Sequence, residues 1–269
     1  MEGSAAMQPS ICAYLEALEI ANYARGTITN RDRVLRRYAE SVGEVLTCGA
    51  RDVQLWWLQL GTVSAQTRGH YLTDVRSFYS WAIRHEMRPD DPTRLIVAPR
   101  TPTYLPRPVP HAIARGLWER IPDDLDRLVI GLMFGCGLRC AEIAAADRED
   151  YDGERLWVHG KGNKTRTVPV PPSLAQLLAA FPPGPILRGR EGGRMLPETV
   201  SCKYARLLRR YGVLATPHQL RHTFGTEAYR RLRDLRAVQD LMGHASPTTT
   251  ARYAAVDVST AGLALADLI

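Results

Sequence analysis

Four residues whose side chains could act together on one phosphodiester lie in a short stretch near the end of the chain. They are His218, Arg221, His244 and Tyr253, and no cluster of carboxylates separates them. A guanidinium binds two phosphate oxygens at once, an imidazole exchanges protons near neutral pH, and a phenol can attack phosphorus. This set could break a phosphodiester without a metal ion and keep the bond energy in a protein phosphate ester.

Two basic residues upstream could complete the set. Arg139 follows GCGL, and Lys161 lies in the turn GKGNK. Arg139 and Arg221 would offset the extra negative charge of a five-coordinate phosphorus, and a lysine at a hairpin tip could protonate the leaving 5′ oxygen. Both have ordinary alternatives: Arg139 could pair with Glu142 or a carbonyl group, and hairpin turns are often rich in Gly, Asn and Lys.

Tyr253 needs help to react, because a free phenol titrates near pH ~10. His218 could take its proton, while His244 could donate a hydrogen bond to a non-bridging oxygen. The alternative is that Tyr253 belongs to the core, as tyrosines of C-terminal helices often do. A zinc site at His218 and His222 is disfavoured, because Gln219 stands where the metalloprotease pattern has glutamate. We expect no metal and no cofactor.

The elements that position these residues can be read from the apolar periodicity. The segment 154–170 alternates, turns at Gly160 to Asn163 and predicts a β-hairpin. Thr216 and Pro217 fit the N-cap and first residue of a helix, which would place His218 and Arg221 on one face of its first turns. The other predicted helices fill the remainder, with breaks near 182–193, 212–217 and 243–247.

The apolar spacing in the N-terminal part of the chain predicts a separate helical domain. From Pro9 to about His85 the apolar spacing fits four helices, with Ser64 as the N-cap of the last, and Phe78, Trp81 and Ala82 facing inward. Seven prolines follow before position 111, which favours an extended connection. The predicted boundaries are a helical domain at 1–88, a linker at 89–110 and a second domain, which holds the candidate reacting residues, at 111–269.

Composition sets the broad class. The chain of 269 residues is 45% hydrophobic and 23% charged, as expected for a folded soluble protein, and its net charge of +7 favours a polyanionic partner. Neither a signal peptide nor a membrane-length apolar run is apparent, so we expect a cytoplasmic protein without membrane contact. The basic residues that could contact such a partner, which would be DNA, are Arg31, Arg68, Arg76, Lys164 and Lys203.

Four ordered motifs resemble those of the tyrosine recombinases of the phage integrase type. GCGLRCAEI is similar to the family's first arginine box and VHGKGNKTRTVPV to its lysine hairpin; TPHQLRHTFGTEAY resembles the H-x-x-R box and LMGHASPTTTARYA the histidine-to-tyrosine segment. The six residues Arg139, Lys161, His218, Arg221, His244 and Tyr253 each fall on a family position. Met242 and Gln219 depart from the usual residues, and neither departure removes a reacting group.

The resemblance implies a fold that is mainly α with a small antiparallel β-sheet, in which a helical core-binding domain precedes a mixed α/β catalytic domain. It implies that Tyr253 forms a 3′-phosphotyrosyl link to double-stranded DNA and that four subunits exchange strands through a Holliday junction. The C-terminal segment would pack on a neighbouring subunit, the alternative being its own core, and accessory DNA-bending proteins of host or phage could take part. A first helix near Pro9 predicts two domains, without the additional arm-binding domain of larger phage integrases.

Several functions remain open at this point. A compact phage or mobile-element integrase leads, and the alternatives are a chromosome-dimer-resolving recombinase, a type IB topoisomerase-like enzyme, and a DNA-binding regulator that has lost the chemistry. The residues do not decide whether Tyr253 works in its own subunit or in a neighbouring one.

Overall fold

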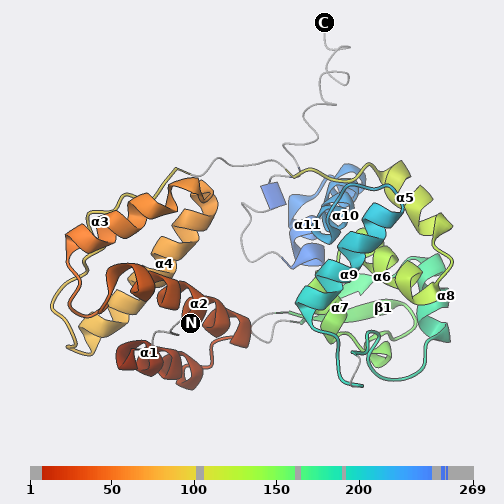
Figure 1. Cartoon of the computed structure of the whole chain (residues 1–269). Helices are drawn as coiled ribbons and strands as arrows, with labels where there is room; N and C mark the ends of the chain where they lie inside the picture. The colour runs from red at the N-terminus through yellow and green to blue at the C-terminus, as the bar shows by residue number, and fades with distance from the viewer. Residues whose placement is uncertain are drawn as a thin grey trace, which may run out of the picture. The chain divides into compact units, whose positions relative to one another are not determined.

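The computed structural model describes residues 8–100, 106–160, 165–189, 192–243, 250, 251 and 253. Within them it is mainly helical, with one small antiparallel sheet, which confirms the predicted fold class. The chain divides into two compact units, Met1–Thr103 and Tyr104–Ile269, and the colours of Figure 1 run from red to yellow through the first and from yellow to blue through the second. The division falls inside the segment predicted as a linker.

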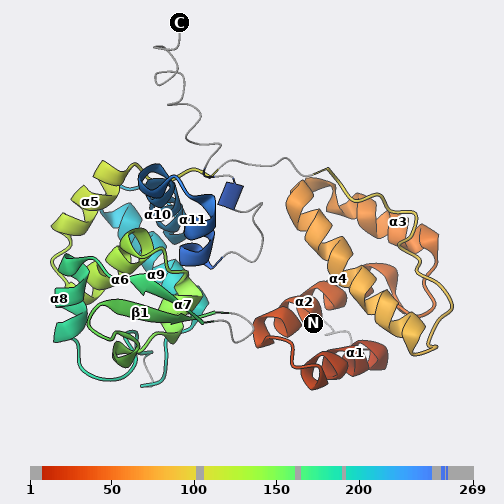
Figure 2. The same ribbon diagram turned by 180° about the vertical axis from the view of Figure 1, so that it is seen from behind.

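The described residues of the first unit form four α-helices, as the apolar spacing predicts, and a short 3-10 helix at Leu60–Thr62. The four α-helices are α1 (Pro9–Ile20), α2 (Arg25–Val42), α3 (Ala50–Gln59) and α4 (Ala65–Arg84), and Figure 2 shows them from behind. Ser64 is the N-cap of α4, where its Oγ accepts a hydrogen bond from Thr67 N at 3.2 Å. Phe78, Trp81 and Ala82 are buried, so their predicted inward direction is confirmed.

Aromatic side chains dominate the core of the first unit. Tyr14 packs against Phe78 edge to face, and Tyr38 packs in the same way against Trp56. The chain after α4 folds back onto this core, because Thr93 is fully buried. Arg76 holds the returning segment by donating hydrogen bonds to Thr93 and to the carbonyl of Ile96 at 2.7 Å.

The second unit holds the elements that surround the candidate site. Its helices are α5 (His111–Arg120), α6 (Asp124–Gly135), α7 (Cys140–Ala145), α8 (Pro172–Ala180), α9 (Pro197–Arg210), α10 (Pro217–Leu232) and α11 (Leu235–Met242). The apolar stretch of α6 is buried throughout, and α10 packs against α6, α5, α9 and α11 (Figure 1). This arrangement places α10 at the centre of the unit.

The predicted hairpin is present. Strands β1 (Arg155–His159) and β2 (Thr165–Pro169) pair antiparallel, with Leu156 opposite Val168 and Val158 opposite Arg166. Leu156, Val158 and Val168 are buried, so one face of the hairpin closes the core. Arg166 lies on the same face as Val168, because the two residues are two apart on the strand.

One helix boundary differs from the sequence prediction. The break between α10 and α11 falls at Arg233, whose φ is 54°, and no glycine or proline marks it. Asp234 explains the restart, since its carboxylate accepts hydrogen bonds from Arg236 N and Ala237 N at 2.8 and 3.1 Å. Among all the helices of the described ranges, none is both long and apolar enough to cross a membrane.

Candidate active site

A tight turn between α6 and α7 places Arg139 at the start of α7. Gly137 lies in the left-handed region with φ +68°, and a Cβ at this position would overlap the ring of Phe224 on α10. Arg139 is the N-cap of α7, and its backbone N donates to Glu142 Oε2 at 2.8 Å. The turn therefore packs against α10 immediately before Arg139.

The predicted start of α10 is confirmed. Thr216 is its N-cap and Pro217 its first residue, and Gln219 Oε1 accepts a hydrogen bond from Thr216 N at 2.9 Å. His218 and Arg221 accordingly lie in the first turns of α10. His218 is exposed to solvent, whereas the side chain of Arg221 is buried inside the unit.

Glu142 binds the guanidiniums of several arginines from separate elements. Arg166 on β2 donates to both its carboxylate oxygens, at 2.7 and 2.9 Å, and Arg139 Nη1 donates to Oε1 at 2.6 Å. Arg221 Nη1 lies 3.6 Å from Oε2. Burial alone would raise the pKa of Glu142, but the hydrogen bonds and charges of Arg166 and Arg139 lower it to about 2. The carboxylate is thus ionised and fixes its arginines in place.

Backbone carbonyls orient the same arginines. Arg221 donates to the carbonyl of Gly137 and, at 2.5 Å, to that of Met242, while Arg139 Nη2 donates to the carbonyl of Gly243 at 3.1 Å. Burial and the charge of Arg139 lower the pKa of Arg221 to about 9, so it remains a cation at neutral pH. The carbonyls tie the end of α11 to both guanidiniums, and the resulting positive site suits a phosphate.

The surroundings of His218 favour its neutral form. Although part of the side chain faces solvent, desolvation of the imidazole and the charges of Arg221 and Arg139 lower its pKa. A neutral imidazole can accept a proton, which is what the sequence interpretation requires of this residue. Its ring lies against that of His222 one turn later on α10, with the centroids 4.4 Å apart and the planes at 71°.

Tyr253 lies against α10 of its own chain. Its side chain is 1% exposed, and it forms a small apolar cluster with Val238 and Met242. Tyr253 Oη is 3.0 Å from His222 Nδ1. The ring is accommodated because Gly225 has no side chain: a Cβ there would lie 2.5 Å from Tyr253 Cζ.

Gly225→Ala is therefore expected to destabilise the protein by about 1–3 kcal/mol, because overpacking forces neighbouring groups to shift. The added Cβ would also lie 2.7 Å from Met242 Sδ. Urea unfolding measures the change. Gly116→Ala on α5 is the matched control, since nothing lies within 4 Å of its added Cβ. Equal stability of the two variants would contradict the packing described for Tyr253.

The structure brings together four of the six residues predicted for catalysis: Arg139, His218, Arg221 and Tyr253. Lys161 and His244 lie outside the described residues, as does the predicted DNA contact Lys164. Lys203 on α9 pairs with Asp126 at 2.7 Å. The catalytic and DNA-binding roles of all these residues stay predictions.

The arginines predicted as DNA contacts in the first unit have internal partners. Arg31 donates to Tyr14 Oη at 2.7 Å and lies 3.6 Å from Asp74, and Arg76 binds the backbone after α4. Arg68 stacks over Trp57, with its Cζ 4.3 Å from the ring centroid. These contacts show structural roles, and DNA contact by the same side chains stays a prediction.

Three residues of the site have no role in it on sequence grounds. Glu142 is expected only as an ordinary partner of Arg139 and His222 only as a disfavoured zinc ligand, while Arg166 falls within the predicted hairpin. Arg166 could have been found, because an arginine on the inward face of a strand requires a buried partner. No local pattern pairs His222 with Tyr253, which is 31 residues away.

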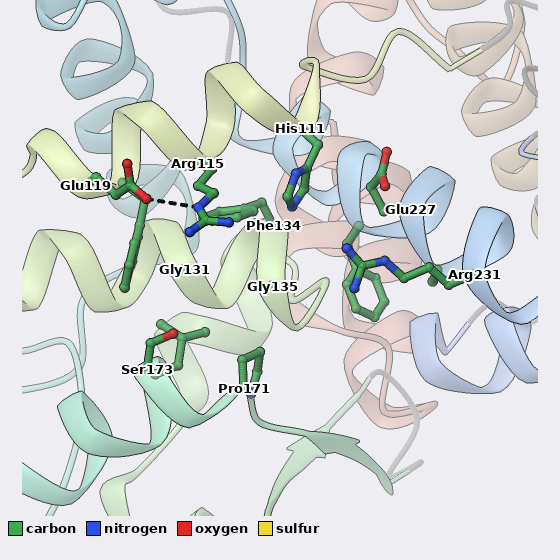
Figure 3. Close-up of a pocket in the computed structure, with 14 residues that line it drawn as sticks. His111, Arg115, Glu119, Gly131, Phe134, Gly135, Pro171, Ser173, Glu227 and Arg231 are labelled. Carbon is green, nitrogen blue, oxygen red and sulfur yellow. Dashed lines mark hydrogen bonds and ion pairs between the residues drawn. The ribbon is translucent and has the colours of Figure 1, made fainter.

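A separate cavity of about 500 Å³ lies among α5, α6, α8 and α10 (Figure 3). Trp118, Phe134 and Phe224 contribute to its apolar lining, and the ion pair of Arg115 with Glu119 lies along it. Of the predicted catalytic residues that the structure describes, none lines this cavity. Over the described parts of the chain, no group of three or more His, Cys, Asp or Glu residues is arranged to hold a metal ion.

One buried carboxylate, Glu142, holds several arginines close to a tyrosine that contacts a histidine. These residue types suit phosphate binding, with the phenol as the candidate nucleophile. The sequence profile of the phage integrase family matches residues 121–260. Tyrosine recombinase XerC of Rhodospirillum centenum is 37% identical over 214 residues, and tyrosine recombinase XerC 1 of Ralstonia nicotianae is 30% identical over 296. The chain belongs to the phage integrase family, the tyrosine recombinases.

The extent of these similarities differs. The alignment with the Rhodospirillum protein covers 72% of this chain but only 63% of that protein, less than two thirds of its length. The alignment with the Ralstonia protein covers 93% of this chain and 89% of that protein. A crystal structure of a lambda integrase dimer bound to a COC′ core site has a TM-score of 0.75 at 15% identity, covering 92% of this chain and 94% of that one. This likeness concerns the fold alone.

Proposed function

We propose that the protein is a site-specific DNA recombinase that cleaves and rejoins DNA through a 3′-phosphotyrosyl intermediate at Tyr253. One observation carries the proposal: Tyr253 packs on Met242, whose carbonyl binds the buried Arg221, and Arg139 is held beside Arg221 through Glu142. The nucleophile and both phosphate-binding cations thus come from a single chain. This supports cleavage by Tyr253 within its own subunit.

In the proposed reaction, Tyr253 Oη forms a bond to the scissile phosphorus and the bond from phosphorus to the 5′ oxygen breaks. Arg139 and Arg221 bind the non-bridging oxygens and stabilise the five-coordinate state. His218, held neutral, accepts the phenol proton; Lys161 protonates the leaving 5′ oxygen. His244 donates a hydrogen bond to a non-bridging oxygen. The 5′ hydroxyl of a partner strand then reverses these steps and joins the strands.

The two units would divide the work on double-stranded DNA. We assign core-site binding to the helical region 1–88 and catalysis to 111–269, connected by 89–110. Four subunits on two synapsed sites would exchange strands through a Holliday junction, with the C-terminal segment of each packed on a neighbour and accessory DNA-bending proteins of host or phage setting the direction. A recombinase acts where its DNA lies, so the proposed location is the cytoplasm.

The decisive experiment uses a suicide DNA substrate nicked near the cleavage position. The wild-type protein is expected to form a protein–DNA adduct that resists denaturation, and Tyr253→Phe is expected to form none, because the variant lacks the attacking hydroxyl. Tyr229→Phe is the matched control, since Tyr229 packs against the same cluster and should keep full activity. Tight binding of wild-type protein without any adduct would favour a regulator and overturn the proposal.

Strand exchange then separates the roles that share this chemistry. We propose a compact phage or mobile-element integrase; the similarity to proteins named tyrosine recombinase XerC favours chromosome-dimer resolution as the second candidate. An integrase joins two different attachment sites, whereas a dimer-resolving enzyme recombines two identical sites on one circle. Relaxation of supercoiled DNA without strand exchange would instead indicate a topoisomerase-like enzyme.

A further inference from the structure

The hydroxyl of Tyr253 contacts a residue to which the proposed reaction gives no part. His222 Nδ1 is 3.0 Å from Tyr253 Oη, and the two rings lie 5.8 Å apart between centroids at an angle of 58°. The distance is that of a hydrogen bond. Because Oη is the atom that attacks phosphorus in the proposed function, His222 touches the reacting group itself.

Packing alone does not determine where this hydroxyl points. The ring of Tyr253 lies over Gly225 and against Val238 and Met242, which are apolar surfaces. Such surfaces fix the plane of a ring, but a buried phenol oxygen also requires a polar partner. The bond to His222 meets that requirement and sets the direction of the oxygen.

The position of His222 on α10 links the nucleophile to the phosphate site. His222 directly follows Arg221, which donates to the carbonyls of Gly137 and Met242. His218, one turn earlier, contacts the His222 ring at 4.4 Å between centroids. A single rigid helix therefore carries a phosphate-binding cation, the proposed base and the partner of the phenol, and such an element holds reacting groups precisely enough for catalysis.

We propose that His222 is the positioning residue of the nucleophile: its Nδ1 hydrogen bond holds Tyr253 Oη in line with the phosphate-binding arginines. The bond holds the oxygen in the same place whichever of the two atoms donates. This inference rests on the proposed function, since it concerns the same tyrosine. It adds a residue that acts on the attacking group rather than on the phosphate or the leaving oxygen.

Three substitutions test the role of Nδ1. His222→Asn keeps a polar amide atom at the position of Nδ1, because both atoms are the same number of bonds from Cβ. His222→Gln places the amide atom further out, at the position of Nε2. His222→Leu has the shape of Asn but no polar atom. Single-turnover adduct formation on the nicked substrate should fall about 10- to 100-fold in the Leu and Gln variants, because a small misplacement of a reacting atom costs this much. The Asn variant should recover most of the rate.

DNA affinity should be the same in all three variants, since most of it comes from phosphate contacts elsewhere. Urea unfolding identifies any variant that is not folded, and the comparison of Asn with Gln remains valid if Leu unfolds. The inference is overturned if Leu cleaves at the wild-type rate, or if Asn is no faster than Gln. Failure of the wild-type protein to form any adduct would instead reject the proposed function.

Discussion

Arg221→Ala is expected to abolish cleavage and to destabilise the protein at the same time. The side chain is 1% exposed and donates to the carbonyls of Gly137 and Met242. Removing it leaves two buried acceptors unpaired and Glu142 with one cation fewer, which costs roughly 3–5 kcal/mol. Loss of a cation that stabilises the developing charge should slow adduct formation by about a thousandfold.

Arg139→Ala is the informative comparison, because this side chain is 37% exposed. Its loss should slow cleavage to a similar degree but change stability by only about 1 kcal/mol. Adduct formation at single turnover and urea unfolding at neutral pH measure the two effects for both variants. Cleavage at the wild-type rate by either variant would show that the replaced arginine does not act on the phosphate. Equal losses of unfolding free energy in Arg139→Ala and Arg221→Ala would show that the burial of Arg221 does not add to stability.

Glu142→Gln is expected to destabilise the protein by roughly 3–5 kcal/mol at neutral pH, although the new side chain has nearly the same shape. The neutral amide cannot balance Arg139, Arg166 and Arg221, which would then face each other in a mostly buried site. Urea unfolding measures the loss. Glu119→Gln is the control, because its ion pair with Arg115 is exposed and should contribute at most about 0.5 kcal/mol.

The same substitution predicts a pH dependence. The pKa of Glu142 is lowered from 4.5 to about 2 in the folded protein, so the carboxylate stabilises the fold fully above pH 4.5 and loses this contribution as the pH falls through about 2. The lowering corresponds to about 3 kcal/mol. The stability gap between wild type and Glu142→Gln should therefore narrow between these pH values. A gap that stays constant over this range would mean that the carboxylate is not the stabilising group.

The arginines predicted to contact DNA in the first unit also stabilise its fold, so their substitution is an ambiguous test of DNA binding. Arg76 holds the segment around Thr93 against the core, and Arg31 binds Tyr14. Their replacement would perturb the unit itself, so a loss of DNA binding would not by itself identify a contact. A basic composition predicts a polyanionic partner, but it does not distinguish arginines that bind DNA from arginines that stabilise the fold.

Much of the secondary structure followed from local patterns. Ser64, Thr216 and Pro217 mark helix starts, and the alternation around Leu156 and Val168 marks the hairpin, because caps and periodicity act over a few residues. The break at Arg233 is not predicted, because no glycine or proline marks it and the apolar spacing continues across it. There the carboxylate of Asp234 caps the next helix.

The sequence by itself determined which residues are candidates for the reaction, since their types and order form four motifs; they are Arg139, Lys161, His218, Arg221, His244 and Tyr253. Only the tertiary structure decided how the four that it describes are held. Glu142 meets Arg166 across 24 positions and His222 meets Tyr253 across 31, while Arg139 reaches the carbonyl of Gly243 across 104. Such contacts arise from the packing of α7, α10, α11 and β2 against one another, and no pattern within a single element encodes them.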